Sequence, residues 1–202
     1  MKTLLAALSL ALLGNTAGAS AVIGQPAPAF SAQDANGRSV SLADFKGKHV
    51  VLEWVNPGCP YVRKHYDAKN MQATQQSAQA KGVVWLAVNS THSGHGDYLP
   101  PARMAGWMQA QGAQATATLM DANGQIGRAY GARTTPHMYL IDPAGRLVYA
   151  GAIDSKASAN PADIPGATNH VNQAIGESLA GRPLSTPATR AYGCTVKYGS
   201  AG

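Results

Sequence analysis

A cysteine followed directly by a proline stands where a buried strand gives way to a helix, and this junction constrains the chain most. The apolar run 50–55 predicts a buried strand, and a Pro-Gly turn separates it from Cys59. Pro60 suits the first position of a helix, because its ring fixes φ and it lacks the N–H that this position cannot use. Cys59 is therefore predicted at a helix N-cap, where free N–H groups and the helix dipole stabilise a thiolate. The alternative is an inert buried cysteine that packs as a small hydrophobic residue.

The N-terminus has the pattern of a secretory signal peptide, predicted over residues 1–19. Lys2 precedes an apolar stretch at 4–13, and Ala17 and Ala19 form an A-x-A cleavage site. Cleavage after Ala21 is the alternative. The apolar stretch is too short to span a bilayer. We therefore expect an exported protein, periplasmic or secreted, without stable membrane insertion.

Composition excludes some functions and leaves the role of the cysteines open. The 202 residues carry a net charge of +6 with only 13% charged residues and no basic run, so nucleic-acid binding is not expected. The length after the signal peptide suits one domain, predicted over 20–180, and a tail at 181–202 carries Cys194. The two cysteines of an exported chain can form a structural disulfide, a redox couple, or both in turn.

Strands and helices alternate along the chain. The predicted elements are a hairpin at 30–33 and 39–41, strands at 50–55, 83–88 and 116–120, helices at 60–80, 101–111 and 125–130, a hairpin at 138–141 and 147–153, and a last helix that Asn169 caps and that ends at residue 180. In the first helix, Val62, Tyr66, Ala73 and Ala80 share one face. These elements predict an α/β fold with a central mixed sheet flanked by helices, an N-terminal hairpin extension and a C-terminal tail. Cys59 then lies at the carboxyl end of the sheet, where reactive groups gather.

Three segments give the chain a family resemblance: IGQPAPAFSAQDANGRSVSLADFKGKHVVLEWV, GCPYV and RTTPHMYLIDPAGRLVYAGAID. Over residues 22–154 the chain resembles the redoxin branch of the thioredoxin superfamily, which includes peroxiredoxins and exported thiol–disulfide oxidoreductases. The final ATRAYGCTVKY resembles a peroxiredoxin-like subgroup with a single cysteine at the thioredoxin motif. The resemblance implies a thioredoxin-like fold in which Cys59 is the nucleophile. It also implies that Cys59 lies opposite a cis-proline, matched by Pro136 after Thr135.

The chain departs from both branches of this family at the positions that set the chemistry. Thioredoxins carry a second cysteine where Val62 stands, so no neighbouring thiol is available. Peroxiredoxins carry threonine or serine where Asn56 stands, and an arginine where Pro136 stands. Arg63 or Arg133 can supply a cation, although neither matches by position. These departures favour thiol–disulfide exchange over peroxide reduction.

Glu53 is an acid in an otherwise apolar strand, six residues before Cys59, where thioredoxins keep a buried acid. Burial raises the pKa of a carboxyl group, which allows Glu53 to exchange a proton with the thiol through a water molecule. The alternative is that Glu53 points into solvent or pairs with a lysine. We predict Glu53 and Pro136 as parts of the catalytic site, beside Cys59 and Cys194.

The remaining site predictions concern substrate and metal. Residues expected to contact substrate are Asn56, Pro60, Arg63, Thr135 and His137. Cys59 with His137 or His95 has the chemistry of a copper or zinc site, but no spacing of ligands is diagnostic. We therefore expect no metal and no cofactor.

The resulting hypothesis is an exported thiol-dependent oxidoreductase. Cys59 attacks a protein or small-molecule disulfide, or a hydroperoxide, and Cys194 or an external thiol reductant resolves the product. Cys194 is the predicted partner because the tail lacks a helical pattern and its β-prone run 195–198 can add to a sheet edge. The alternative is a thioredoxin-fold protein that binds metal or a partner without turnover, with Cys59 as a ligand or in a structural disulfide.

Overall fold

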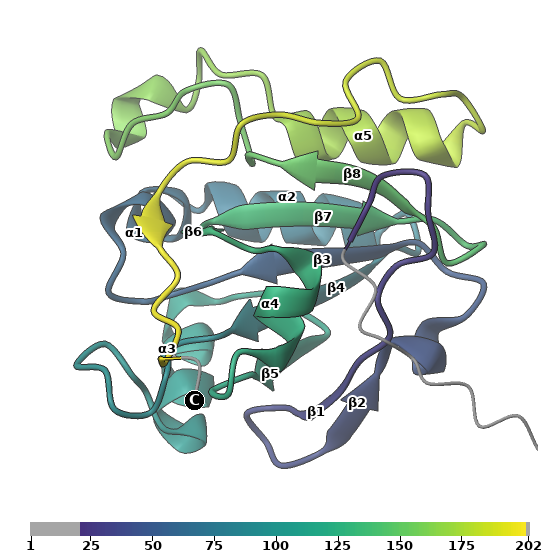
Figure 1. Cartoon of the computed structure of the whole chain (residues 1–202). Helices are drawn as coiled ribbons and strands as arrows, with labels where there is room; N and C mark the ends of the chain where they lie inside the picture. The colour runs from purple at the N-terminus through teal and green to yellow at the C-terminus, as the bar shows by residue number, and fades with distance from the viewer. Residues whose placement is uncertain (1–20, 201–202) are drawn as a thin grey trace, which may run out of the picture.

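A mixed five-stranded sheet forms the centre of the computed structural model, which describes residues 21–200; the predicted signal peptide lies outside them. The strands follow the order β5-β4-β3-β7-β8 across the sheet (Figure 1). They are β3 (Val50–Trp54), β4 (Val84–Asn89), β5 (Ala117–Met120), β7 (His137–Ile141) and β8 (Leu147–Gly151). Strands β4 and β5 run parallel to β3, whereas β7 and β8 extend the sheet as an antiparallel pair. The predicted mixed sheet is confirmed.

Helices cover both faces of this sheet. The helices are α1 (Pro60–Asp67), α2 (Asn70–Gln79), α3 (Pro101–Gln111), α4 (Gln125–Tyr130) and α5 (His170–Leu179). Val51 packs in one core with α1, α2, α3 and α5, while Leu52 packs in the other with α4 and the N-terminal segment. Successive strand residues point to opposite faces, so β3 supplies both cores. Among the described residues no helix has the length and apolar character to cross a membrane.

Short elements complete the fold. They are the hairpin β1 (Ser31–Gln33) and β2 (Ser39–Ser41), the 3₁₀ turns η1 (Leu42–Phe45) and η2 (Pro161–Asp163), and the pair β6 (Thr134–Thr135) and β9 (Cys194–Thr195). The predicted N-terminal hairpin is confirmed. The predicted cap of the last helix is also confirmed, since the Asn169 side chain accepts a hydrogen bond from the N–H of Asn172 at 2.9 Å.

The single helix predicted over 60–80 is wrong. Lys69 adopts a left-handed conformation (φ 60°) and separates α1 from α2. The side-chain amide of Gln72 donates to the freed carbonyl oxygen of Tyr66 at 2.9 Å, which satisfies the end of α1. The break changes the face that α2 buries, so Ala73 and Ala80 are exposed. The residues that α2 buries are Met71, Gln72, Thr74, Gln75 and Ala78.

The C-terminal tail returns across the molecule to the end of the sheet. After α5 it runs beside β8, where the Thr189 N–H donates to the Ala150 carbonyl oxygen at 3.2 Å. It then descends past α1, and β9 pairs antiparallel with β6 (Figure 1). The predicted addition of the tail to a strand edge is therefore confirmed, although that edge belongs to the two-residue β6 rather than to the central sheet.

Candidate functional site

Cys59 occupies the N-cap of α1, as the sequence predicts. Its backbone is extended (φ −84°, ψ 122°), its carbonyl oxygen accepts from the Arg63 N–H at 3.0 Å, and Pro60 fills the first helical position. The residue is only 2% exposed. The N-terminus of α1 therefore presents its free N–H groups and positive dipole end around this sulfur.

Asn56 shapes the turn that carries Cys59. Its side-chain oxygen accepts from the Gly58 N–H at 2.8 Å, and its backbone oxygen accepts from the Cys59 N–H at 3.0 Å. Its amide nitrogen donates to the carboxylate of Asp97 at 3.3 Å. Because Asn56 is buried and these groups are engaged within the protein, its geometry is that of a turn-forming residue.

The loop before β7 faces Cys59. The Thr135–Pro136 peptide bond is cis, which confirms the isomer implied by the family resemblance. The sulfur of Cys59 lies 3.0 Å from the carbonyl oxygen of Thr135. In the reduced protein this oxygen can accept a hydrogen bond from the thiol.

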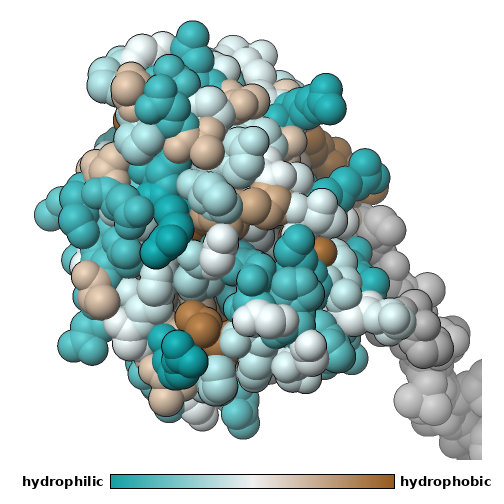
Figure 2. Space-filling view, turned by 90° about the vertical axis from the view of Figure 1, so that its left-hand side faces the viewer, coloured by the Kyte–Doolittle hydropathy of each residue, from teal (hydrophilic) through white to brown (hydrophobic). Residues whose placement is uncertain are grey.

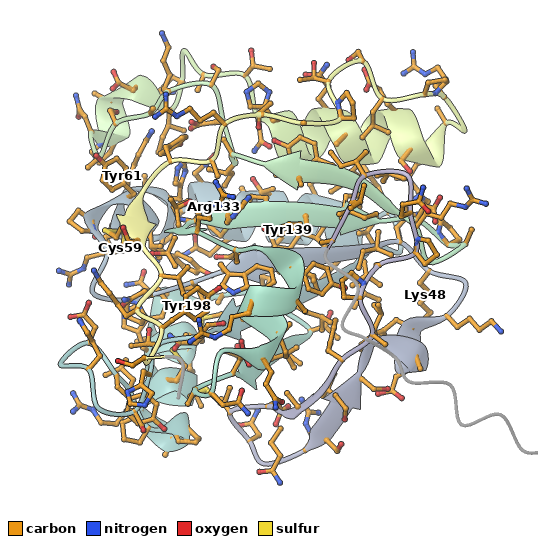
Figure 3. All side chains as sticks on the ribbon, in the orientation of Figure 1. Lys48, Cys59, Tyr61, Arg133, Tyr139 and Tyr198 are labelled. Carbon is orange, nitrogen blue, oxygen red and sulfur yellow. A yellow bond between two sulfur atoms is a disulfide. The ribbon has the colours of Figure 1, made fainter. Side chains whose placement is uncertain are left out.

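Cys59 and Cys194 form a disulfide, with their Cα atoms 5.9 Å apart and a sequence separation of 135 (Figure 3). The predicted pairing of the two cysteines is confirmed. Cys194 stands opposite Thr135 in the register of β6 and β9. Gly193 makes this approach possible, because its φ is +134° and a Cβ atom there would overlap the Thr135 carbonyl oxygen.

Tyr192 anchors the tail two residues before Cys194. Its hydroxyl donates a short hydrogen bond to the buried carboxylate of Asp154 and lies 3.3 Å from Nε2 of His65. Its ring packs against Tyr61, with centroids 5.9 Å apart. Burial, reinforced by the hydrogen bond to Asp154, raises the pKa of Tyr192 well above its usual value, so the hydroxyl keeps its proton and acts as the donor.

Lys64 and His65 complete this buried cluster from α1. The Lys64 Nζ lies 3.6 Å from a carboxylate oxygen of Asp154 and donates to the Lys156 carbonyl oxygen at 3.0 Å. Burial lowers the pKa of His65 to about 4, which leaves the ring neutral at pH 7. Its Nδ1 accepts from the Asn70 amide at 2.8 Å, so its proton resides on Nε2, facing Tyr192.

Glu53 is fully buried in β3, as expected of an acid that serves the site, and does not point into solvent. It accepts hydrogen bonds from the Tyr66 hydroxyl at 2.8 Å, the Gln75 amide at 3.0 Å and the Trp85 indole at 2.7 Å. Desolvation outweighs these three donors and raises the pKa of Glu53 to about 7. When Glu53 is protonated, its carboxyl group can donate a hydrogen bond to the Tyr66 hydroxyl. That hydroxyl can then donate to the Met108 sulfur, 4.0 Å away.

The other predicted contacts are distributed around the disulfide. Pro60 and Arg63 are exposed on α1, and Arg133 is exposed before β6. His137 is half-buried, and its Nδ1 lies 3.2 Å from the Tyr139 hydroxyl. Burial and the nearby Arg133 charge lower the pKa of His137 to about 4.

The sequence did not identify the cluster of Tyr192, Asp154 and Lys64. The run RKHY contains the basic member of this cluster, Lys64. The acidic member, Asp154, lies ninety positions later in the sequence, so no local pattern joins the two. Within residues 21–200 no three histidine, cysteine or acidic side chains gather as a set that could hold a metal ion.

Comparison with known proteins finds relatives of this chain among thiol–disulfide exchange proteins. The chain is 29% identical to the thiol-disulfide oxidoreductase ResA of Bacillus subtilis over 62% of this chain and 64% of that protein. The match therefore spans slightly less than two thirds of that relative. This chain is also 30% identical to the thiol:disulfide interchange protein DsbE of Pseudomonas aeruginosa, over 68% of this chain and 71% of that protein.

A solved structure shares the fold of this chain. The crystal structure of a putative thiol:disulfide interchange protein DsbE from Chlorobium tepidum superposes with a TM-score of 0.59 and 26% identity. The superposition covers 79% of this chain and 99% of that one. The fold is thus thioredoxin-like, as the sequence predicts. Residues 23–150 match the model of the AhpC/TSA family, and the chain belongs to that family.

Proposed function

We propose that this protein is an exported thiol–disulfide oxidoreductase in which Cys59 and Cys194 form the working redox couple. The observation that carries the proposal is the disulfide between an N-cap cysteine and a tail cysteine held opposite Thr135. The similarity to ResA and DsbE supports the same reaction class. The signal-peptide pattern supports export.

The proposed reaction proceeds by successive thiol–disulfide exchanges at Cys59 and Cys194. In the reduced protein the Cys59 thiolate attacks one sulfur of a substrate disulfide and expels the other as a thiolate, which takes a proton. The Cys194 thiolate then attacks the Cys59 sulfur, forms the internal disulfide and releases the second substrate thiol. An external thiol reductant returns both cysteines to the reduced state by two further exchanges.

Glu53 is proposed as the group that carries protons for these steps. With its pKa raised to about 7, it is protonated in part of the molecules near neutral pH, which suits transfer in either direction. It lies on the face of β3 that packs against α1, the helix that Cys59 caps. The proposed route runs through a water molecule.

Peroxide is a less suitable oxidant for this geometry. The amide of Asn56, which stands where peroxiredoxins carry a hydroxyl, is engaged by Gly58 and Asp97. Arg63 is exposed to solvent.

The face that carries α1 and the tail is largely hydrophilic, with only small separate hydrophobic areas (Figure 2), so it offers no broad apolar surface for a partner.

A trapping experiment tests the proposal. In the Cys194→Ser variant the second step is blocked, so incubation with a peptide disulfide should accumulate a mixed disulfide on Cys59, detected by mass spectrometry. The matched Cys59→Ser variant should accumulate none at that position. In the unchanged protein the midpoint potential should lie within the roughly −120 to −270 mV range of exchange enzymes. A disulfide that stays oxidised below about −300 mV, with no trapped complex, would identify a structural bridge instead.

A further inference from the structure

A cavity of about 820 Å³ opens beside the pair β6–β9, between α4, the strands β7 and β8, and the tail. Its volume lies within the range of roughly 300–1,000 Å³ typical of small-molecule sites. Arg133 and Tyr139, which both line it, lie between the tail and α4 in Figure 3. The site reactions described above do not use this cavity.

The charged residues that line the cavity are all basic. Arg128, Arg133 and Arg190 line it, and no aspartate or glutamate is among its lining residues. Arg133 is exposed and makes no salt bridge within residues 21–200. Its charge is close enough to contribute to the lowered pKa of His137, which also lines the cavity. A cavity with this field attracts an anion.

The inner wall of the cavity is apolar in character. Tyr130 and Tyr139 pack edge-to-face, with centroids 5.5 Å apart. Their hydroxyl groups are already used, because Tyr130 donates to the Pro28 carbonyl oxygen at 2.7 Å and Tyr139 to the Tyr130 carbonyl oxygen at 2.9 Å. Leu147 adds an aliphatic side chain to the lining. Such a wall accommodates an alkyl or aromatic body rather than further polar groups.

The cavity also touches the redox site. Thr134 lines it and pairs with Thr195, the residue after Cys194. The tail residues 189–191 form another part of its wall. A molecule bound here therefore lies against the segment that carries the second cysteine.

We propose that this cavity binds a small amphiphilic carboxylate, with the carboxylate at the arginines and the apolar body against the tyrosines. This inference deepens the proposed function, on which its catalytic half rests: the preferred small-molecule disulfide carries a carboxylate on an aromatic or alkyl body. Arg133 is the main anionic contact, because its guanidinium has no competing carboxylate and it immediately precedes β6. An arginine binds a carboxylate through two parallel hydrogen bonds.

Calorimetry with decanoate on the purified, oxidised protein tests binding independently of exchange. Decanoate should bind saturably, whereas decanamide, which lacks the charge, should bind at least about tenfold more weakly, and acetate should not bind measurably. Arg133→Gln should weaken decanoate binding about tenfold. Arg103→Gln, which removes an exposed arginine on α3 outside the cavity, should leave decanoate binding unchanged. Equal affinity for decanoate and decanamide, or equal losses in the two variants, would overturn the proposal.

The catalytic half is tested with two aromatic disulfides on the reduced protein. One is 5,5′-dithiobis(2-nitrobenzoate), which carries a carboxylate on each ring, and the other is the uncharged 4,4′-dithiodipyridine. Arg133→Gln should slow reaction with the first about tenfold and leave the second unchanged. Reaction with both disulfides but no decanoate binding would refute the cavity proposal alone. Decanoate binding without reaction at either disulfide would refute the proposed exchange function alone.

Discussion

Removal of a single hydroxyl group should change the redox equilibrium of the disulfide. In Tyr192→Phe the ring remains, but the hydrogen bond to the buried Asp154 carboxylate is lost. That carboxylate keeps the backbone N–H of Lys156 as a donor at 2.9 Å and Lys64 at 3.6 Å, so it stays paired. Hydrogen bonds to charged groups contribute about 1.5–3 kcal/mol. We take the lower value, about 1.5 kcal/mol, because the other partners remain.

We expect the loss of this hydrogen bond to destabilise the oxidised protein more than the reduced protein. In the oxidised protein the disulfide holds Cys194, and hence Tyr192, in the docked position. We expect the tail of the reduced protein to leave the docked position, so that the stability of the reduced state does not depend on this hydrogen bond. The loss therefore falls mainly on the oxidised state and should shift the midpoint potential by about +30 mV, a roughly tenfold change in the equilibrium constant.

The assay equilibrates each protein in glutathione or dithiothreitol buffers of known ratio and measures the oxidised fraction by thiol alkylation and a gel shift. Tyr61→Phe is the matched control. It makes the same change in the ring that packs against Tyr192, but within the described residues the Tyr61 hydroxyl has no hydrogen-bond partner. Its potential should equal that of the unchanged protein. If Tyr192→Phe also leaves the potential unchanged, and both redox forms lose equal stability, then the tail stays docked on reduction and the reasoning is refuted.

Two further predictions concern Glu53 and Gly193. The folded-state pKa of Glu53, about 7, exceeds the ordinary 4.5, so between these pH values the folded protein holds a proton that the unfolded chain has released. The free energy of unfolding should therefore fall by about 3 kcal/mol as pH rises through this window. Glu53→Gln should remove this fall when the free energy of unfolding, measured by denaturant melts, is plotted against pH. The same pH dependence in the variant and the unchanged protein would exclude a raised pKa of Glu53. Gly193→Ala should displace β9, because the new methyl group overlaps the Thr135 carbonyl oxygen, and should lower the disulfide-bonded fraction formed at a fixed glutathione ratio. Gly176→Ala meets no atom within 4 Å and should form the disulfide normally; equal fractions in the two variants would contradict the packing argument.

The capping position of Cys59 is a feature that the sequence predicted correctly from a local signal. Cys59 and Pro60 are adjacent, and the capping position follows from their order alone. The cis bond before Pro136 followed from family resemblance, not from any local rule. The break at Lys69 could not be predicted, because the apolar spacing in 60–80 fits one continuous helix and the cap at Tyr66 comes from a side chain six residues later.

The tail anchor was missed for a different reason. Tyr192 and Asp154 are 38 residues apart, and His65 is 127 residues from Tyr192. Nothing in the sequence near Tyr192 distinguishes it from a solvent-exposed tyrosine. A buried polar cluster is assembled by tertiary packing, and its members become recognisable only when the folded chain brings a donor to each acceptor.

Burial of Cys59 makes the tail part of the proposed mechanism. Cys59 is 2% exposed while Cys194 is bonded to it, and β9 occupies the edge of β6 beside the sulfur. In-line exchange at the Cys59 sulfur places the entering and leaving sulfur atoms on opposite sides of it, so a mixed disulfide with substrate needs space beside Cys59 that the buried site of the oxidised protein does not offer. In the proposed mechanism the tail therefore withdraws to admit substrate and returns so that Cys194 can resolve the mixed disulfide. A stronger anchor at Tyr192 favours return and a weaker one favours withdrawal, so the potential of the disulfide and the access of substrate to Cys59 are set by the same contact.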